Sequence, residues 1–270
     1  MCGISGMFAL DGVLPPGARA SVEAMNAAIA HRGPDGDGFF EDSVAILGHR
    51  RLAIIDRAGG RQPLTNEDQT IWAMFNGEIY NHRALRAVLE SKGHRYRTAS
   101  DTETILHAYE EYGPACLDRL EGMFALVIYD ARRREFFAAR DRLGKKPLFY
   151  TVLDGVFHFA SELQALQASH LWQGDVDLSA LEGYLSLGYF LAPSTIYRNV
   201  SKLMPGHWLR IANGRIETRQ YWDVTEFDTD QRSDDEIIEE IDSTLRQAVH
   251  DRLESEVPLG AFLSGGIDSG

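Results

Sequence analysis

The sequence predicts an α+β fold in which antiparallel sheets pack against helices. Strand-like segments rich in β-branched and aromatic residues alternate with Gly, Pro and Asn turns, and a few amphipathic helices interrupt them without a βαβ rhythm. The expected strands are GISGMFAL (3–10), VAILGHRRLAIID (44–56), TIWAMFNG (70–77), GMFALVIYD (122–130), REFFAARD (134–141) and GVFHFASE (155–162).

Helices are expected at five places, each marked by apolar spacing or a capping residue. The first spans 18–30, the second follows Asn81 as a plausible cap, and the third runs from about Thr102 to Tyr112. A fourth begins near Leu178. The fifth runs from Ser233 to Leu253, where Ser233 and Glu236 form a capping box. Between the fourth and fifth helices, Asn213-Gly214 predicts a hairpin turn.

Composition and charge exclude several classes of protein. The chain has 270 residues and a net charge of −13, which is not the electrostatic footprint of a nucleic-acid binder. No apolar run reaches the roughly 18 residues of a membrane helix, and no basic flank marks a signal peptide. Two cysteines provide no disulfide framework, so we expect a reducing cytoplasm.

The charge is concentrated at the C-terminal end. From residue 223 onward there are three basic and fourteen acidic residues, so most of the negative charge lies there. The acidic, apolar-poor stretch 223–232 is interpreted as a linker. After it come the acidic helix, whose charged side we expect to be solvated, an apolar strand VPLGAFL (257–263) and the sequence SGGIDSG.

Cys2 is the first candidate for catalysis. Removal of Met1 would place a thiol and a free α-amino group on one residue, and an amine with a pKa of roughly 7.7–8 can accept the thiol proton. The alternative is that Cys2 is a small buried residue that opens an edge strand. The other cysteine, Cys116, is expected in the core.

Carboxamide hydrolysis also needs oxyanion donors and groups that hold the rest of the substrate. Asn76 and Gly77 could supply a side-chain amide and a backbone N–H, although Asn-Gly is also typical of an ordinary turn. Arg51 suits a carboxylate, and Asp101 could bind an ammonium group or cap a helix. We assign no metal ligand, since the histidines lack the usual ligand spacing.

The motifs, taken in order, resemble the glutaminase domain of glutamine-hydrolysing asparagine synthetases. They are MCGISGMF, HRGPDGDG, GHRRLAIID, QPLTNED, NGEIYNH, SDTETIL, GMFALVIYD, ARDRLGKKPLFY and FASELQAL, and they cover residues 2 to 166 almost continuously. The resemblance implies a four-layer αββα sandwich of the N-terminal-nucleophile hydrolase type. It also implies a glutamine amidotransferase core at 2–166, an extension of that domain at 167–222, and the truncated start of an α/β ATP-binding domain at 233–270.

The resemblance also implies a role for each site residue. Cys2 is the expected nucleophile, and Asn76 and Gly77 are the expected oxyanion donors. The expected glutamine-binding residues are Arg51 for the α-carboxylate, Asp101 for the α-amino group, and the lining residues Leu52, Ile54, Ile55 and Glu78.

A second site is implied near the end of the chain. SGGIDS resembles the phosphate loop of the same synthetases, although an SGG turn can also be a plain flexible loop. The expected ATP-binding residues are Leu263, Ser264, Gly265, Gly266, Asp268 and Ser269.

Together these features predict glutamine hydrolysis through a Cys2 thioester. In the full enzyme the ammonia would convert aspartate and ATP, with Mg²⁺, to asparagine, while the glutaminase step needs no cofactor. We expect small-molecule substrates and no binding to nucleic acid or membranes. Whether the chain forms a homodimer stays open. Two alternatives remain: amidation of another carboxylate, as in exopolysaccharide biosynthesis, or a non-catalytic glutamine-binding module that retains Met1.

Overall fold

The computed structural model describes residues 1–172, 174–224 and 231–267, and it contains two six-stranded antiparallel sheets. The first sheet has the order β10-β8-β9-β1-β3-β2, with strands β1 (Gly3–Ala9), β2 (Gly36–Glu41), β3 (Ala45–Arg51), β8 (Phe149–Leu153), β9 (Val156–Ala160) and β10 (Ser201–Lys202). The second has the order β12-β11-β7-β6-β5-β4, with β4 (Leu64–Thr65), β5 (Ile71–Ile79), β6 (Gly122–Asp130), β7 (Glu135–Arg140), β11 (His207–Ala212) and β12 (Arg215–Gln220).

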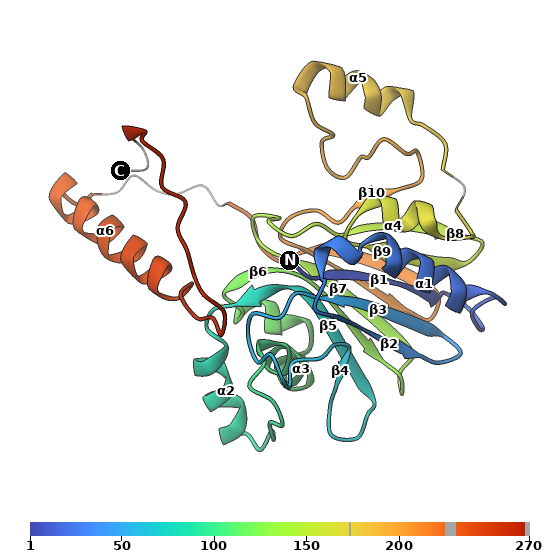
Figure 1. The fold of residues 1–270 in the computed structure, drawn as a ribbon, viewed down its shortest axis with the longest axis horizontal. Helices are drawn as coiled ribbons and strands as arrows, with labels where there is room; N and C mark the ends of the chain where they lie inside the picture. Colours follow the sequence, from blue (N-terminus) through green and yellow to red (C-terminus); the bar gives the residue numbers. More distant parts are fainter. Residues whose placement is uncertain (173, 225–230, 268–270) are drawn as a thin grey trace.

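Helices cover the outer face of each sheet, so the predicted four-layer αββα sandwich is confirmed (Figure 1). On the first sheet lie α1 (Ala18–Ala28) and α4 (Leu163–Ala168), which share an apolar cluster with β1, β3 and β9. On the second lie α2 (His82–Ser91) and α3 (Asp101–Tyr112), followed by a short 3₁₀ helix (Gly113–Asp118) that buries Cys116 as expected. Another 3₁₀ turn, Ala30–Arg32, follows α1.

The alternation of side chains along β6 explains why the two sheets stack. Ala125, Val127 and Tyr129 join the apolar cluster between the sheets. Their neighbours Phe124, Leu126 and Ile128 point the other way and pack beneath α2 and α3. A strand covered on both faces is apolar throughout, which is why GMFALVIYD contains no regular polar position.

Two helix starts differ in detail from what their caps predict. Ser100, not Asp101, caps α3, because its side-chain oxygen accepts the N–H of Thr102. Asn81 occupies the cap position of α2 but makes no capping bond. Its amide instead bonds Arg119 O at 2.8 Å and Glu121 N at 3.1 Å.

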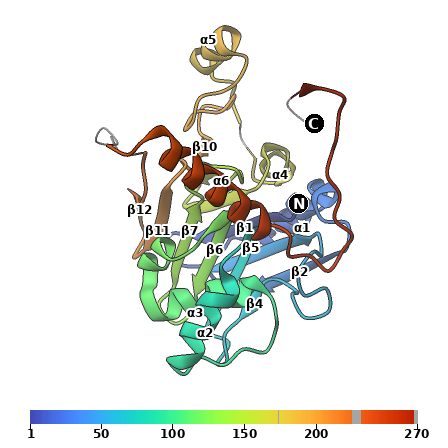
Figure 2. The ribbon, with the colours of Figure 1, turned by 90° about the vertical axis from the view of Figure 1, so that its left-hand side faces the viewer.

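After α4 the chain leaves the sandwich and returns to it. Helix α5 (Leu178–Leu187) buries no residue, and it projects away from the layers in both views (Figures 1 and 2). The predicted Asn213-Gly214 turn joins β11 to β12, and both residues have positive φ angles, 51° and 72°.

The C-terminal part lies beside the sandwich. Helix α6 (Asp234–His250) begins with the predicted Ser233–Glu236 capping box and lies in front of the two sheets in Figure 2. It buries no residue, so its apolar stripe is exposed along with its charged side. Most of the expected linker, residues 225–230, lies outside the described residues.

The strand expected at 257–263 is a wrong prediction. These residues form no strand, and Phe262 and Leu263 are exposed. An apolar run becomes a strand only when neighbouring strands complete its hydrogen bonds, and no described strand lies beside it. No described helix is both long enough and apolar enough to cross a membrane.

Candidate active site

Cys2 directly precedes β1, a strand in the interior of the first sheet. Because β1 pairs with both β3 and β9, Cys2 does not open an edge strand, and that alternative is wrong. The Sγ atom accepts the Leu52 N–H at 3.4 Å and lies 3.6 Å from Leu52 O. These contacts hold the thiol against the loop that follows β3.

Two polar side chains fix the main chain of Cys2. Arg32 Nε donates to Cys2 O at 2.9 Å, and Arg32 Nη1 pairs with Glu162 at 2.6 Å. With the amide of Asn76 oriented to satisfy both of its ends, Nδ2 donates to Cys2 O at 3.0 Å and Oδ1 accepts from Arg32 Nη2 at 3.1 Å. Sequence reasoning missed Arg32, although the HRGPDGDG motif contains it. His31 from the same motif is exposed and pairs with Glu162 instead.

The thiol is not ionised by its surroundings. Burial raises the pKa of Cys2, and this effect outweighs the Leu52 N–H and the nearby N-terminal amine, which lower it. Burial likewise lowers the pKa of the Met1 amine. Since the thiol is protonated near neutral pH, its use as a nucleophile needs a base within reach.

Asn76 and Gly77 lie inside β5 and do not form a turn. They pair with Ala125 and Phe124 of β6, so the strand continues past the point where TIWAMFNG was expected to end. A Cβ on Gly77 would lie 2.2 Å from Met123 O and 2.8 Å from Phe124 Cα. The glycine is therefore required by close approach to the neighbouring strand and not by a positive φ angle.

The backbone N–H of Gly77 points away from β6. Along β5 the N–H groups alternate, and that of Tyr80, just beyond the strand, bonds Glu121 O beside β6. The odd-numbered residues face the other way: Phe75 N bonds Gln62 Oε1 at 2.7 Å and Ile79 N bonds Asp101 Oδ2 at 3.0 Å. Within the described residues no group accepts the N–H of Gly77, which lies between these two. Gly77 lines a cavity that Cys2 also lines, so its N–H is a candidate donor to a bound substrate.

Asp101 is the first residue of α3. Its carboxylate is buried and accepts the N–H of Ile79, two residues beyond Gly77 on β5. Burial raises its pKa to about 7, and the N–H of Ile79 only partly offsets this effect. A buried carboxylate is stabilised in its charged form by a nearby cation, so Asp101 is suited to bind an ammonium group.

Arg51 ends β3 and turns its guanidinium toward the following loop. Nη1 donates to Arg57 O at 2.9 Å, and Nη2 donates to Ile55 O at 3.3 Å and Asp56 O at 2.5 Å. These bonds hold the loop around the arginine, which also borders the cavity.

One cavity of about 90 Å³ brings the predicted glutaminase residues together. All nine line it: Cys2, Arg51, Leu52, Ile54, Ile55, Asn76, Gly77, Glu78 and Asp101. Sequence reasoning missed the other lining residues, which are Met1, Gly60, Gln62, Phe75, Ser100, Met123 and Lys146. Gln62, Ser100, Met123 and Lys146 lie within the quoted motifs, but only the tertiary fold shows that they reach the cavity.

The expected ATP-binding residues do not join this cavity. Leu263, Ser264, Gly265 and Gly266 are exposed, and Asp268 and Ser269 lie outside the described residues. Gly266 N donates to Ser264 Oγ at 3.3 Å, so this turn is partly closed on itself. Among the described residues no helix follows this turn, and the ATP site stays a prediction.

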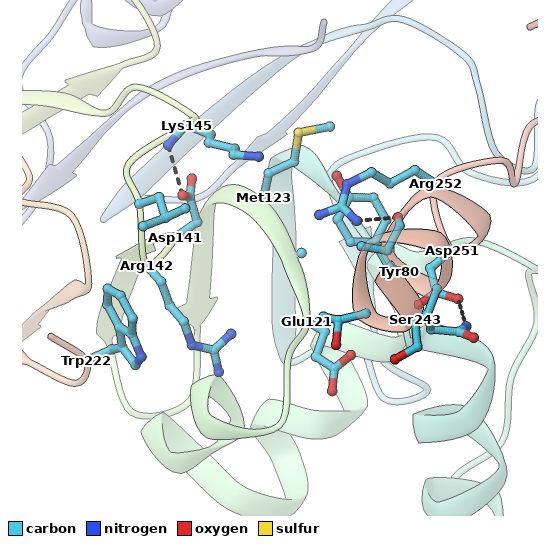
Figure 3. A pocket seen from close by; sticks show the side chains of 15 residues that line it. Tyr80, Glu121, Met123, Asp141, Arg142, Lys145, Trp222, Ser243, Asp251 and Arg252 are labelled. Carbon is cyan, nitrogen blue, oxygen red and sulfur yellow. Dashed lines mark hydrogen bonds between the residues drawn. The ribbon is translucent and has the colours of Figure 1, made fainter. Parts of the chain in front are cut away.

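A larger cavity, of about 740 Å³, lies between α6 and the start of β6 (Figure 3). Figure 3 shows Tyr80, Glu121 and Met123 on the sandwich side and Ser243, Asp251 and Arg252 on the helix side. It carries none of the predicted catalytic residues, and Met123 is the lining residue that it shares with the Cys2 cavity.

One group of potential metal ligands occurs among the described residues. His94, His107 and Glu110 place one ligand atom each within 4.8 Å of one another, although sequence spacing gave no sign of them. His107 already pairs with Glu110 at 2.8 Å and lies 3.9 Å from Glu103. Burial lowers the pKa of His107, but these two carboxylates outweigh burial and raise it to about 9. In the protein without a metal, His107 is therefore an ion-pair partner of these carboxylates.

Comparison with known proteins agrees with this geometry. Residues 1–222 match the glutamine amidotransferase domain family, and residues 240–270 match the asparagine synthase family. The whole chain is 39% identical over 273 residues to a Bacillus subtilis protein named asparagine synthetase [glutamine-hydrolyzing] 1, of which it spans 43%. It is also 35% identical over its full length to a Penicillium rubens protein named amidase chyE, of which it spans 41%.

The fold has a solved counterpart. A glutamine phosphoribosylpyrophosphate amidotransferase from B. subtilis superposes with a TM-score of 0.58 at 20% identity, over 82% of this chain and 49% of that one. The two proteins therefore share a fold, which agrees with the αββα sandwich that the sequence predicts. The chain belongs to the glutamine amidotransferase family of enzymes, and its last residues match the start of an asparagine synthase region.

Proposed function

We propose that this chain hydrolyses glutamine to glutamate and ammonia, with Cys2 as the nucleophile after removal of Met1. The observation that carries the proposal is that Gly77, whose N–H is not bonded to β6, lines the same cavity as Cys2. A backbone donor held in place before the substrate arrives costs little reorganisation when charge develops on an oxygen.

The reaction follows from the residues around Cys2. The α-amine of Cys2 takes the thiol proton, and the thiolate attacks the side-chain carbonyl carbon of glutamine. Gly77 N–H and Asn76 Nδ2 stabilise the oxyanion, and the amine returns its proton to the departing ammonia. Water then cleaves the thioester, which releases glutamate and restores the thiol.

Arg51 and Asp101 hold the other end of glutamine. The guanidinium binds the α-carboxylate, and the buried Asp101 carboxylate binds the α-amino group. Ile54, Ile55, Leu52 and Glu78 line the space between the two ends. A substrate held at both ends presents its amide carbon to the thiolate in one orientation.

A glutaminase assay of Cys2→Ala tests the mechanism, with Cys116→Ala as the matched control. Cys116 is fully buried and burial raises its pKa to about 12, so its thiol is inert. We expect Cys2→Ala to lose activity by at least about a thousandfold and Cys116→Ala to retain it. Equal activity in wild type and Cys2→Ala would sink the mechanism.

The acceptor of the ammonia belongs to the whole protein, since the chain spans about two fifths of the two curated relatives compared above. We propose asparagine synthesis from aspartate and ATP, with Mg²⁺ accompanying the ATP, supported by the match of residues 240–270. The described residues do not complete a nucleotide site. Amidation of a different carboxylate is the competing proposal, and product analysis of the full-length protein with candidate carboxylates separates the two.

Retention of Met1 would favour a binding module instead. Met1 lines the cavity, and its Sδ contacts Lys146 Nζ at 2.8 Å, so its side chain occupies part of the space beside the thiol. Mass determination of the purified N-terminus decides between the two. We expect the mass without Met1, and a retained Met1 together with glutamine binding but no hydrolysis would establish the module.

A further inference from the structure

The segment that follows α6 is bonded to the wall of the Cys2 cavity. We call residues Arg252–Glu256 the docking segment. The Glu256 carboxylate accepts the N–H groups of Asp56 at 3.2 Å and Arg57 at 2.9 Å, and the Glu256 N–H donates to Ile54 O at 3.0 Å. These three bonds join parts of the chain that are about 200 residues apart in sequence.

The loop that Glu256 bonds is the one that surrounds Arg51. Arg51 donates to the carbonyls of Ile55, Asp56 and Arg57 from the cavity side, while Glu256 accepts the N–H groups of Asp56 and Arg57. The two side chains therefore bond opposite edges of the same two peptide groups, Ile55–Asp56 and Asp56–Arg57. A cation on the carbonyls and an anion on the N–H groups also match the orientation of the peptide dipoles.

This loop has a backbone conformation that needs such support. Asp56 has a φ of +46°, in the left-handed region that residues other than glycine seldom adopt. Its own carboxylate bonds Gly59 N at 2.8 Å and Ala99 N at 2.9 Å. Conformations of this kind persist where the surroundings fix them at several points, and Glu256 supplies two of those points.

The docking segment has two further anchors, at the end of β5 and the start of α2. Glu254 bonds His82 at 3.1 Å and Arg83 at 2.8 Å, and the guanidinium of Arg252 lies 4.3 Å above the ring of Tyr80. Tyr80 directly follows β5, the strand that presents Asn76 and Gly77. The segment, which lies in the region that matches asparagine synthases, thus contacts both the loop around Arg51 and the residues just after β5.

We propose that Glu256 is a positioning residue for glutamine, because it fixes the loop that orients Arg51 toward the substrate α-carboxylate. This inference rests on the proposed function and adds to it a regulatory contact. A movement of residues 240–270, which match asparagine synthases, would displace Glu256 and change the loop around Arg51. It would thereby alter the affinity for glutamine without moving Cys2.

The test compares Glu256→Ala and Glu256→Gln with the matched control Glu239→Gln in the full chain. Glu239 is an exposed residue of α6, and within the described residues its side chain makes no hydrogen bond or ion pair. We expect both Glu256 variants to raise the KM for glutamine about fivefold or more while kcat stays within twofold, and the control to match wild type. A KM within twofold of wild type in Glu256→Ala, or a fall in kcat alone, would overturn the proposal.

A second readout separates this proposal from the glutaminase mechanism. Hydrogen exchange at the amides of Asp56 and Arg57 should accelerate in Glu256→Ala and not in the control, whether or not the chain turns over glutamine. Glutamine affinity is also measured in the Cys2→Ala background with and without Glu256→Ala. Unchanged exchange and unchanged affinity would refute the role of Glu256, whereas active Cys2→Ala would refute only the nucleophile.

Discussion

Asp101 Oδ2 accepts the backbone N–H of Ile79 at 3.0 Å, and this bond attaches the start of α3 to the strand that carries Asn76 and Gly77. Ser100 supplies the helix cap, so the Asp101 side chain is not needed for capping. The buried carboxylate of Asp101 is thus fixed beside β5, the strand that carries Gly77, the proposed oxyanion donor. Its protonation state should govern how well the cavity binds an ammonium group.

The first prediction concerns pH and glutamine affinity. The pKa of Asp101 is raised from 3.8 to about 7 in the free protein, so the carboxylate is charged only above pH 7. Because the bound ammonium favours the charged form, the Kd for glutamine should weaken about tenfold for each pH unit below 7. Calorimetry in the Cys2→Ala background measures this without turnover of glutamine.

Two variants make the assignment to Asp101 specific. Asp101→Asn should weaken binding about tenfold or more at pH 8 and remove the pH dependence. Asp37→Asn changes the same charge at an exposed position of β2 and should behave as wild type. A pH dependence that survives in Asp101→Asn would assign the titration to another group.

The second prediction concerns the close contact at Gly77. In Gly77→Ala, β5 and β6 must separate, because the new Cβ would meet Met123 O at 2.2 Å. We expect a loss of about 1–3 kcal/mol in the free energy of unfolding and about a hundredfold fall in kcat from the displaced N–H. Gly36→Ala is the control, since a Cβ there meets no atom within 4 Å. Urea unfolding and a glutaminase assay measure both effects, and wild-type kcat in Gly77→Ala would contradict the role of this donor.

The third prediction concerns stability and the His107 ion pairs. Its folded pKa of about 9 lies above the unfolded value of 6.5, since Glu103 and Glu110 outweigh burial. The stabilisation is therefore complete below pH 6.5 and is lost as the pH rises through 9, by about 2–3 kcal/mol. Urea unfolding at pH 6 and pH 9.5 should show this difference in wild type and little of it in His107→Gln. An equal difference in both proteins would place the titrating group elsewhere.

The sequence predicted the site better than the local structure of its parts. Motif order identified the nine lining residues, whose separate segments the fold then brings together. Asn76-Gly77 was less well predicted, because pairing with Ala125 and Phe124 outweighs the tendency of this dipeptide to turn. Arg32 and Gln62 were missed. Their side chains bond the backbone atoms Cys2 O and Phe75 N, and only the tertiary fold brings those atoms near them.

In the C-terminal region the sequence predicted local structure, but not the contacts with the rest of the chain. The capping box of α6 is local and was predicted, because Ser233 and Glu236 satisfy each other's backbone groups within one turn. The strand at 257–263 was not realised, since a strand depends on neighbours that local pattern cannot supply. Glu256 carries no motif at all, and only its bonds to Asp56 and Arg57 reveal it.

The most direct test of the central claim is to trap the intermediate. Enzyme mixed with glutamine is quenched in acid within the first turnovers, digested, and analysed by peptide mass spectrometry. We predict a γ-glutamyl thioester on the peptide that begins at Cys2, without Met1 and absent from Cys2→Ala. Hydrolysis of glutamine with the adduct on another residue, or an active enzyme whose N-terminal peptide still carries Met1, would contradict the mechanism.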